Sequence, residues 1–162
     1  MKKTVGRLSD SVLPVSYSIE LEPSEDMSSY IGKIEIKALV KNPVKDIILH
    51  SKDLEIKNAT ICVGTQCLLP TLEEEKESET ILLKNMKAIP IGEIEIHIEF
   101  NSSITESLSG IYRSKYEYEG KTKYLITTQC EAPYARRIFP CFDEPGKKAT
   151  FDISVKISKG LT

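Results

Sequence analysis

The stretch from Thr127 to Phe151 holds most of the residues in this sequence whose types and spacing could do chemistry. It reads TTQCEAPYARRIFPCFDEPGKKATF, with the carboxylate of Glu131 two places after the amide of Gln129. Three prolines stiffen the stretch, since each fixes its own φ and biases the preceding residue toward extended backbone. A carboxylate on so restrained a loop can bind a cationic group, and loops of this composition often carry function.

The charged residues of this stretch also have ordinary structural interpretations. Glu131 can be a surface carboxylate that binds nothing. Arg136 and Arg137 can pair with Asp143 or Glu144, because oppositely charged residues on one loop often form ion pairs. From the residue types alone, this structural interpretation is favoured for all five side chains.

The residues with metal-binding or redox chemistry are four cysteines and two histidines: Cys62, Cys67, Cys130, Cys141, His50 and His97. Their spacings match neither a C-x-x-C redox pair nor a four-ligand zinc knuckle, so the sequence predicts no metal site. Three disulfide pairings are possible in principle, but in a cytosolic chain we expect reduced, at least partly buried thiols that fill space.

Length and charge limit the classes of protein to which this chain can belong. It has 162 residues, the size of one ordinary domain, with 40% hydrophobic and 28% charged residues. Its net charge of -2 gives it no basic field for nucleic acid. No apolar run follows the first lysines as in a signal peptide, and none is long enough to cross a membrane. We therefore expect one cytoplasmic domain over residues 1–162, without nucleic-acid or membrane partners.

The dominant pattern along the chain is alternation with period two, which indicates half-buried strands. It is strongest in KIEIKALVK (Lys33–Lys41), GEIEIHIEF (Gly92–Phe100) and FDISVKIS (Phe151–Ser158). The residues predicted to face inward are Ile34, Ile36, Ala38, Val40, Ile94, Ile96, Ile98, Phe100, Phe151, Ile153, Val155 and Ile157. His97 falls on the opposite, solvated face of its strand.

Weaker strand signals fall at Val15–Leu21, Val44–Leu49, Leu54–Val63, Thr80–Leu83, Gly110–Tyr116 and Lys123–Thr128. The charged run EEEKESE, Glu73–Glu79, is typical of a solvated hairpin loop. No long helical period is present, and the strand spacing is close to that of an all-β sandwich. The predicted fold class is therefore all-β, as one sandwich of mostly antiparallel strands.

The stretch TQCEAPYARRIFPCFDEPGKKATF resembles the motif T-Q-x-E-x-x-x-A-R-R-x-F-P-C-F-D-E-P-x-x-K-A-x-F. That motif is found in the N-terminal domain of the aminopeptidase N family of zinc aminopeptidases, which includes the puromycin-sensitive and tricorn-interacting enzymes. Shorter similarities support it: LPVSYSIELEP, YIGKIEI, ILHSKDL and LSGIYRSKY resemble successive segments of that domain. The resemblance covers nearly the full chain and implies the saddle-like β fold of that N-terminal domain.

The resemblance implies that Glu131 binds the free α-amino group of a peptide substrate and that Gln129 lines the pocket for the first side chain. The family's G-x-M-E-N and H-E-x-x-H motifs are missing from this sequence, so the zinc ligands and catalytic residues are not in this chain. It is thus expected to act with its own catalytic domain and to be inert alone.

Two positions beside Glu131 depart from the pattern, because many relatives have an aromatic residue where Cys130 stands and proline where Ala132 stands. They leave the preferred first residue of the substrate open. A branch similar to leukotriene A4 hydrolase shares T-Q-C but has glutamine where Glu131 stands, so it ranks lower. A stand-alone β-sandwich interaction module is the other alternative.

Overall fold

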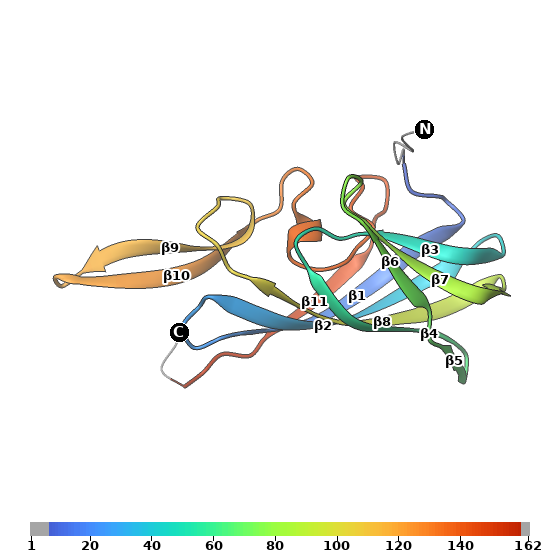
Figure 1. The fold of residues 1–162 in the computed structure, drawn as a ribbon, viewed down its shortest axis with the longest axis horizontal. Helices are drawn as coiled ribbons and strands as arrows, with labels where there is room; N and C mark the ends of the chain where they lie inside the picture. The colour runs from blue at the N-terminus through green and yellow to red at the C-terminus, as the bar shows by residue number, and fades with distance from the viewer. Residues whose placement is uncertain (1–6, 160–162) are drawn as a thin grey trace.

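The computed structural model of this chain describes residues 7–159, and strands dominate it (Figure 1). The strands are β1 (Val12–Pro23), β2 (Ser29–Val40), β3 (Val44–His50), β4 (Glu55–Val63), β5 (Gln66–Leu68), β6 (Thr71–Glu75), β7 (Thr80–Ile89), β8 (Gly92–Ser103), β9 (Gly110–Tyr118), β10 (Lys121–Gln129) and β11 (Thr150–Val155). A short 3-10 helix, η1 (Ala135–Arg137), lies between β10 and β11. No helix among these residues is long and apolar enough to cross a bilayer.

The largest sheet has six strands in the order β11-β1-β2-β8-β4-β5. All its neighbours are antiparallel except β1 and β11, which run parallel. The alternation in the sequence predicts its inner face correctly at the centre: Ile36 pairs with Ile96, and both side chains are fully buried. His97 points to the outer face and is 42% exposed, as predicted.

A second, three-stranded sheet in the order β3-β7-β6 covers part of the large sheet's inner face (Figure 1). Its buried residues, which include Ile47, Leu49, Ile81 and Leu83, join those of the large sheet in one hydrophobic core. Two packed sheets around one core confirm the predicted all-β, sandwich-like fold.

The third sheet is a ribbon of two strands, β9 and β10, that extends away from the other sheets (Figure 1). Tyr116, Tyr124 and Leu125 of this ribbon are each more than two-fifths exposed. An isolated two-stranded ribbon is at best marginally stable in water, so this one depends on what its faces contact.

The apolar residues predicted for the last strand take the inner face as expected, but they are not buried among the described residues. Phe151, Ile153, Val155 and Ile157 are each more than half exposed. The first three lie in register with buried residues of β1, on the inner face of the sheet. Because β11 is the edge strand and the smaller sheet does not reach over it, nothing among residues 7–159 buries that face.

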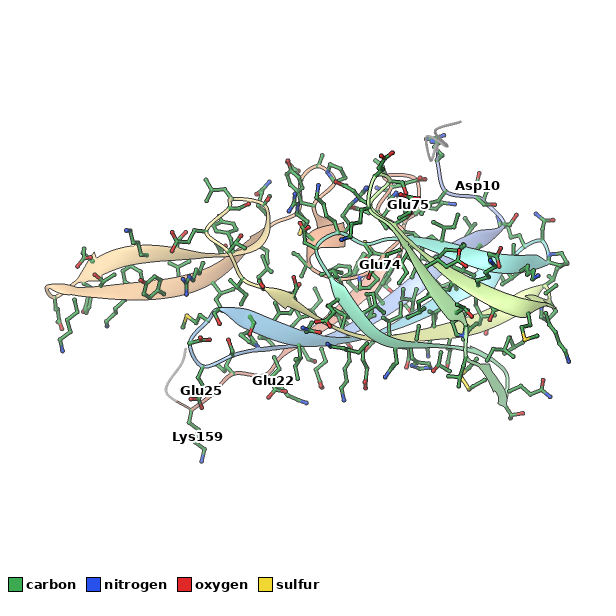
Figure 2. All side chains as sticks on the ribbon, in the orientation of Figure 1. Asp10, Glu22, Glu25, Glu74, Glu75 and Lys159 are labelled. Carbon is green, nitrogen blue, oxygen red and sulfur yellow. A yellow bond between two sulfur atoms is a disulfide. The ribbon has the colours of Figure 1, made fainter. Side chains whose placement is uncertain are left out.

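The charged run Glu73–Glu79 is only partly the predicted loop. Glu73 to Glu75 belong to the edge strand β6, where Figure 2 shows Glu74 and Glu75. Their side chains are exposed and carry no apolar alternation, so their backbone pairing with β7 is invisible to the hydrophobic pattern. Glu79, at the other end of the run, is half-buried and not solvated.

Two of the four cysteines are oxidised, which corrects the expectation of reduced thiols. Cys62 and Cys67 lie opposite each other on β4 and β5 and form a disulfide. The tight hairpin brings their Cα atoms to 4.0 Å, and spacing in the sequence alone could not single out this pairing. Cys141 is free and buried, as predicted, whereas Cys130 is free and exposed.

Gly32 on β2 lies directly opposite Phe100 on β8, and the phenyl ring occupies the space where a side chain at position 32 would stand. A Cβ atom built there would overlap the ring, and Phe100 is only 2% exposed, so the ring has little room to move. The absence of a side chain at position 32 is thus a packing requirement of the large sheet.

We expect Gly32→Ala to lower the free energy of unfolding by about 1–3 kcal/mol, the usual cost of overpacking a core. Urea unfolding followed by circular dichroism measures the change. Gly64→Ala is a poor control because its φ of 57° penalises any side chain, so Gly146→Ala, with open space around it, serves instead. Equal stability of Gly32→Ala and the natural chain would contradict this packing.

Candidate functional site

The loop between β10 and β11 is anchored by the buried guanidinium of Arg136, whose side chain is 10% exposed. Its Nε donates a hydrogen bond to Asp143 Oδ2 at 2.9 Å, and its Nη2 donates to the Asp143 carbonyl oxygen at 3.3 Å. Its Nη1 donates to Glu79 Oε2 at 3.2 Å. A buried charge needs such pairing, so these contacts fix where the loop can lie.

Glu79 brings the turn between β6 and β7 to the same cluster. Its carboxylate also accepts a hydrogen bond from Lys52 Nζ, and its carbonyl oxygen accepts one from Ser51 N at 2.8 Å. Burial would raise the pKa of Glu79, but Lys52 and Arg136 together hold it below its usual value. The backbone of Glu79 is left-handed, with φ of 54°, a conformation that surrounding contacts must hold.

The neighbouring arginine is held by a different turn. Arg137 Nη1 donates to Asp53 Oδ2 at 2.7 Å, and its guanidinium lies 5.7 Å from the ring centre of Tyr134. Gly110 has φ of 68°, and a Cβ atom there would come within 2.6 Å of Arg137 Cβ. Asp53 is left-handed as well, with φ of 58°. Each arginine of the pair therefore has its own carboxylate from a distant turn.

Two buried tyrosines tie the loop to the large sheet. Tyr30 Oη donates to the carbonyl oxygen of Ile138 at 2.7 Å, and Tyr17 Oη accepts from Phe142 N at 3.1 Å. Burial raises the pKa of both phenols, so both stay neutral and keep these bonds across the ordinary pH range. Phe139 and Phe142 of the loop are themselves nearly fully buried.

His50 joins the end of β3 to the loop. Its backbone exchanges hydrogen bonds with Cys141, and its Nδ1 accepts a hydrogen bond from Asp143 N at 3.2 Å. Burial, with a smaller contribution from Arg136, lowers the pKa of His50. A neutral imidazole is the form in which Nδ1 can accept this bond, so the observed contact and the direction of the shift agree.

The far end of the loop is tied to the N-terminal segment. Lys147, whose side chain is only 3% exposed, donates from Nζ to the Ser9 carbonyl oxygen and to Asp10 Oδ1 at 2.9 and 2.7 Å. Glu144 Oε1 accepts from Leu8 N at 2.6 Å. Residues 136–147 thus contact both packed sheets and the start of the described chain.

Glu131 lies at the exposed tip of this loop. Tyr134 N donates to the Cys130 carbonyl oxygen at 2.9 Å and closes the turn that carries Glu131, whose peptide bond to Ala132 is cis. Gln129 Nε2 reaches the Glu131 carbonyl oxygen at 3.5 Å, so the two predicted site residues lie together. Among residues 7–159, no ion pair or hydrogen bond engages the Glu131 carboxylate, which is therefore available to a cationic ligand.

The two arginines of the loop form ion pairs that hold the loop in place, but only one of them has a predicted partner. Arg136 pairs with Asp143, as one of the structural interpretations predicts. Arg137 does not pair with Asp143 or Glu144 but with Asp53. Sequence reasoning did not single out Asp53 or Glu79, because they lie far away along the chain. Asp53 lies in the segment ILHSKDL, which resembles the family's N-terminal domain, but that resemblance assigned no role to Asp53.

Cys130 lies beside Glu131 and is exposed. Burial of its sulfur, together with the nearby negative charge of Asp143, raises its thiol pKa. A raised pKa keeps the thiol protonated and makes it a poor nucleophile. At neutral pH, Cys130 therefore lies beside Glu131 mainly as the protonated thiol.

Comparison with known proteins gives consistent matches. Residues 13–162 match the Peptidase M1 N-terminal domain family. The chain is 35% identical to Aminopeptidase M1-C of Oryza sativa subsp. japonica, over 96% of this chain and 18% of that protein. It is 34% identical to the mitochondrial Aminopeptidase 2 of Saccharomyces cerevisiae, over 100% and 18%. For Aminopeptidase N of Lactococcus lactis the identity is 34%, over 96% and 17%. The chain spans less than a fifth of these relatives.

The charge cluster predicts a large loss of stability for Arg136→Met. Removal of the guanidinium leaves the Asp143 carboxylate without its ion-pair partner and leaves Glu79 with Lys52 alone, and breaking a buried pair costs about 3–5 kcal/mol. Lys37→Met is the matched control, since Lys37 is 55% exposed and its pairs contribute under about 1 kcal/mol. Urea unfolding measures both, and similar losses would refute the structural weight given to Arg136.

The lowered pKa of His50 predicts that stability decreases as pH falls from 7.5 to 5.5. The unfolded imidazole binds a proton near pH 6.5, before the folded one does, so stability present above pH 6.5 is lost below it. His50→Asn keeps an acceptor for Asp143 N but does not titrate. Urea unfolding across this range should show a smaller loss for the variant, and parallel losses would exclude His50 as the cause.

Proposed function

Since this chain belongs to the Peptidase M1 N-terminal domain family, we propose that it is the N-terminal β domain of a zinc-dependent aminopeptidase, in which Glu131 binds the α-ammonium group of a peptide substrate. The observation that carries this proposal is the position of Glu131. Its carboxylate stands exposed and without a partner among the described residues, at the tip of a loop in which Arg136, Arg137 and Lys147 are each paired with a carboxylate.

A carboxylate is the appropriate group for recognising a chain end. An ammonium ion within about 4 Å of it gains about 4 kcal/mol at an effective dielectric constant of 20. The α-amine of a peptide has a pKa of about 7.7–8.0, so it is largely charged at neutral pH, whereas an internal or acetylated peptide nitrogen carries no charge. Gln129, beside Glu131, is proposed to line the pocket for the first side chain of the substrate.

The zinc ion of such an enzyme does not fit this chain. Residues 7–159 contain no group of three or more His, Cys, Asp or Glu side chains arranged to hold a metal. We therefore place the metal ligands and the hydrolytic residues in a separate catalytic domain, and residues 1–162 form a single domain that is inert alone. The chain's own contribution is to bind and orient the substrate amine.

The catalytic domain is also the proposed partner of the β9–β10 ribbon. Tyr116, Tyr124 and Leu125 are large side chains that remain 43–45% exposed on a two-stranded ribbon. Such a ribbon gains stability when a neighbour covers it. The ribbon leads directly into Gln129 and Glu131, so a domain that contacts it would face the recognition site.

The sequence and the disulfide favour different cellular compartments for this chain. The cytoplasmic location predicted from the sequence stays a prediction, while the Cys62–Cys67 disulfide is typical of an oxidising environment. The stand-alone module and the leukotriene A4 hydrolase-like enzyme remain the alternatives. Peptides as the substrate class are favoured by the relatives, which are named aminopeptidases.

The central prediction concerns Glu131→Gln in the enzyme that contains this chain together with its catalytic domain. Loss of the charge should lower kcat/KM for a peptide with a free N-terminus by about 10- to 100-fold, since hydrogen bonds to charged groups contribute about 1.5–3 kcal/mol. Steady-state kinetics on a fluorogenic peptide measures this effect, and the acetylated peptide should stay uncleaved.

Glu25→Gln provides the control, because Glu25 is another exposed glutamate, at the turn between β1 and β2 and outside the β9–β10 ribbon. It should leave kcat/KM unchanged. Both variants should keep the thermal midpoint of the natural enzyme. If Glu131→Gln cleaves the free-amine peptide as well as the natural enzyme does, the recognition role is wrong. If it unfolds instead, Glu131 is structural.

A further inference from the structure

Arg137 contacts three separate segments of the chain around the turn that carries Glu131. Its Nη1 donates to Asp53 Oδ2 at 2.7 Å, on the turn between β3 and β4. Its guanidinium lies 5.7 Å from the ring centre of Tyr134, and its Cβ occupies the space where a side chain at Gly110 would stand. A single side chain therefore joins the β3–β4 turn, the start of β9 and the turn that carries Glu131.

The contact with Gly110 reaches Gln129. Gly110 is the first residue of β9 and lies in register with Gln129, the last residue of β10. Residues opposite each other in antiparallel strands have Cα atoms about 4.5–5.5 Å apart, so a shift of Gly110 moves Gln129 with it. The helix η1, which contains Arg137, is in contact with β9. Arg137 therefore limits where this end of the ribbon can lie.

The contact with Tyr134 reaches Glu131. Tyr134 N donates to the Cys130 carbonyl oxygen at 2.9 Å and closes the turn over residues 130–134. The Tyr134 carbonyl oxygen accepts a hydrogen bond from Arg137 N at 3.1 Å. The π electrons of an aromatic ring attract a guanidinium that lies near them. Both the backbone and the side chain of Arg137 therefore hold the residue that closes the Glu131 turn.

The β3–β4 turn is a fixed support for Asp53. Lys52 N donates to the Arg136 carbonyl oxygen at 2.9 Å, and Ser102 Oγ donates to the Asp53 carbonyl oxygen at 2.6 Å. The left-handed backbone of Asp53, with φ of 58°, is a conformation that such contacts must hold. The Asp53 carboxylate is thus fixed in place, and Arg137 transmits its position toward the tip of the loop.

Arg137 has weaker stabilising contacts than its neighbour Arg136. Its ion pair with Asp53 is largely solvated, because the Asp53 side chain is 67% exposed, and solvated pairs stabilise folded proteins little. Its Nε is buried without a hydrogen-bond acceptor among residues 7–159, which is unfavourable for a donor. A side chain with such contacts, placed against the supports of Gln129 and Glu131, is better explained by positioning than by stability.

We propose that Arg137, held by Asp53, is a positioning residue that fixes Glu131 and Gln129 where a substrate amine meets them, an inference that rests on the proposed function of Glu131. Arg137 does not contact the substrate, because its charge is engaged by Asp53. It restricts the movement of the loop tip instead. A binding group must be held within about 0.5 Å of its productive position, so a displaced Glu131 carboxylate binds an amine more weakly although its charge is unchanged.

Steady-state kinetics of the enzyme that contains this chain together with its catalytic domain tests this role. Asp53→Asn removes the charge that holds Arg137, while asparagine keeps the size of the side chain and tolerates left-handed backbone. For a peptide with a free N-terminus, it should raise KM by about 3- to 10-fold with kcat nearly unchanged, because binding and not chemistry is affected. Arg137→Met should raise KM further.

Lys84→Met is the matched control for the loss of an exposed ion pair. Lys84 Nζ pairs with Glu73 at 3.0 Å on the smaller sheet, and both side chains are about half exposed. Its removal should leave KM unchanged. The thermal midpoints of Asp53→Asn and Lys84→Met should both stay near that of the natural enzyme, since exposed pairs contribute little to stability.

Double variants with Glu131→Gln distinguish positioning from general damage to the enzyme. If Asp53 acts through Glu131, Asp53→Asn should lose most of its effect on kcat/KM in an enzyme that already lacks the Glu131 charge. The two fold-losses should therefore not multiply, as they do for independent sites.

The positioning role is wrong if Asp53→Asn and Arg137→Met both keep the natural KM. It is also wrong if Asp53→Asn lowers kcat/KM by the same factor with and without the Glu131 charge, or if its loss of activity comes with a clear fall in the thermal midpoint. A Glu131→Gln enzyme with the natural kcat/KM would instead refute the proposed function, and with it this role of Arg137.

Discussion

The buried guanidinium of Arg136 is the constraint on which the candidate site depends. A charge in this position must be paired, and its two carboxylates come from different parts of the chain, Asp143 from the same loop and Glu79 from the turn after β6. The loop can therefore take up its place only when the smaller sheet is in place. This pairing converts a surface loop, which would otherwise be mobile, into a support of fixed position.

The support leaves the carboxylate of Glu131 without a partner among residues 7–159. The charges of Arg136, Arg137 and Lys147 are neutralised within the domain, while Glu131 is not. A carboxylate held on a rigid base and still unpaired loses little entropy when it meets a cation, and it has no competing ion pair to break. The same separation is what the proposed role of Glu131 requires, namely a charge that is held in position but not neutralised.

The sequence predicted the central strands well because their inner faces are covered and their apolar residues alternate. It failed at edges. β6 includes the exposed glutamates Glu73, Glu74 and Glu75, and the apolar row of β11 is more than half exposed among the described residues. In both strands the burial therefore differs from what the hydrophobic pattern predicts. In the candidate site, the pairing of Arg136 with Asp143 was predictable from the charges of the loop, whereas the roles that the motif implies for Glu131 and Gln129 stay predictions. The contributions of Asp53 and Glu79 required the topology, since no local signal connects residues so distant in sequence.

The parallel pairing of β1 with β11 has a consequence for how the protein is made. Tyr17 and Phe151 lie opposite each other with ring centres 4.7 Å apart, so among the described residues the first strand, β1, is paired with the last strand, β11. During synthesis, β1 must wait with one edge open until β11 has emerged from the ribosome. Translation speed over the intervening residues therefore sets how long that nascent edge is exposed to chaperones and to other nascent chains.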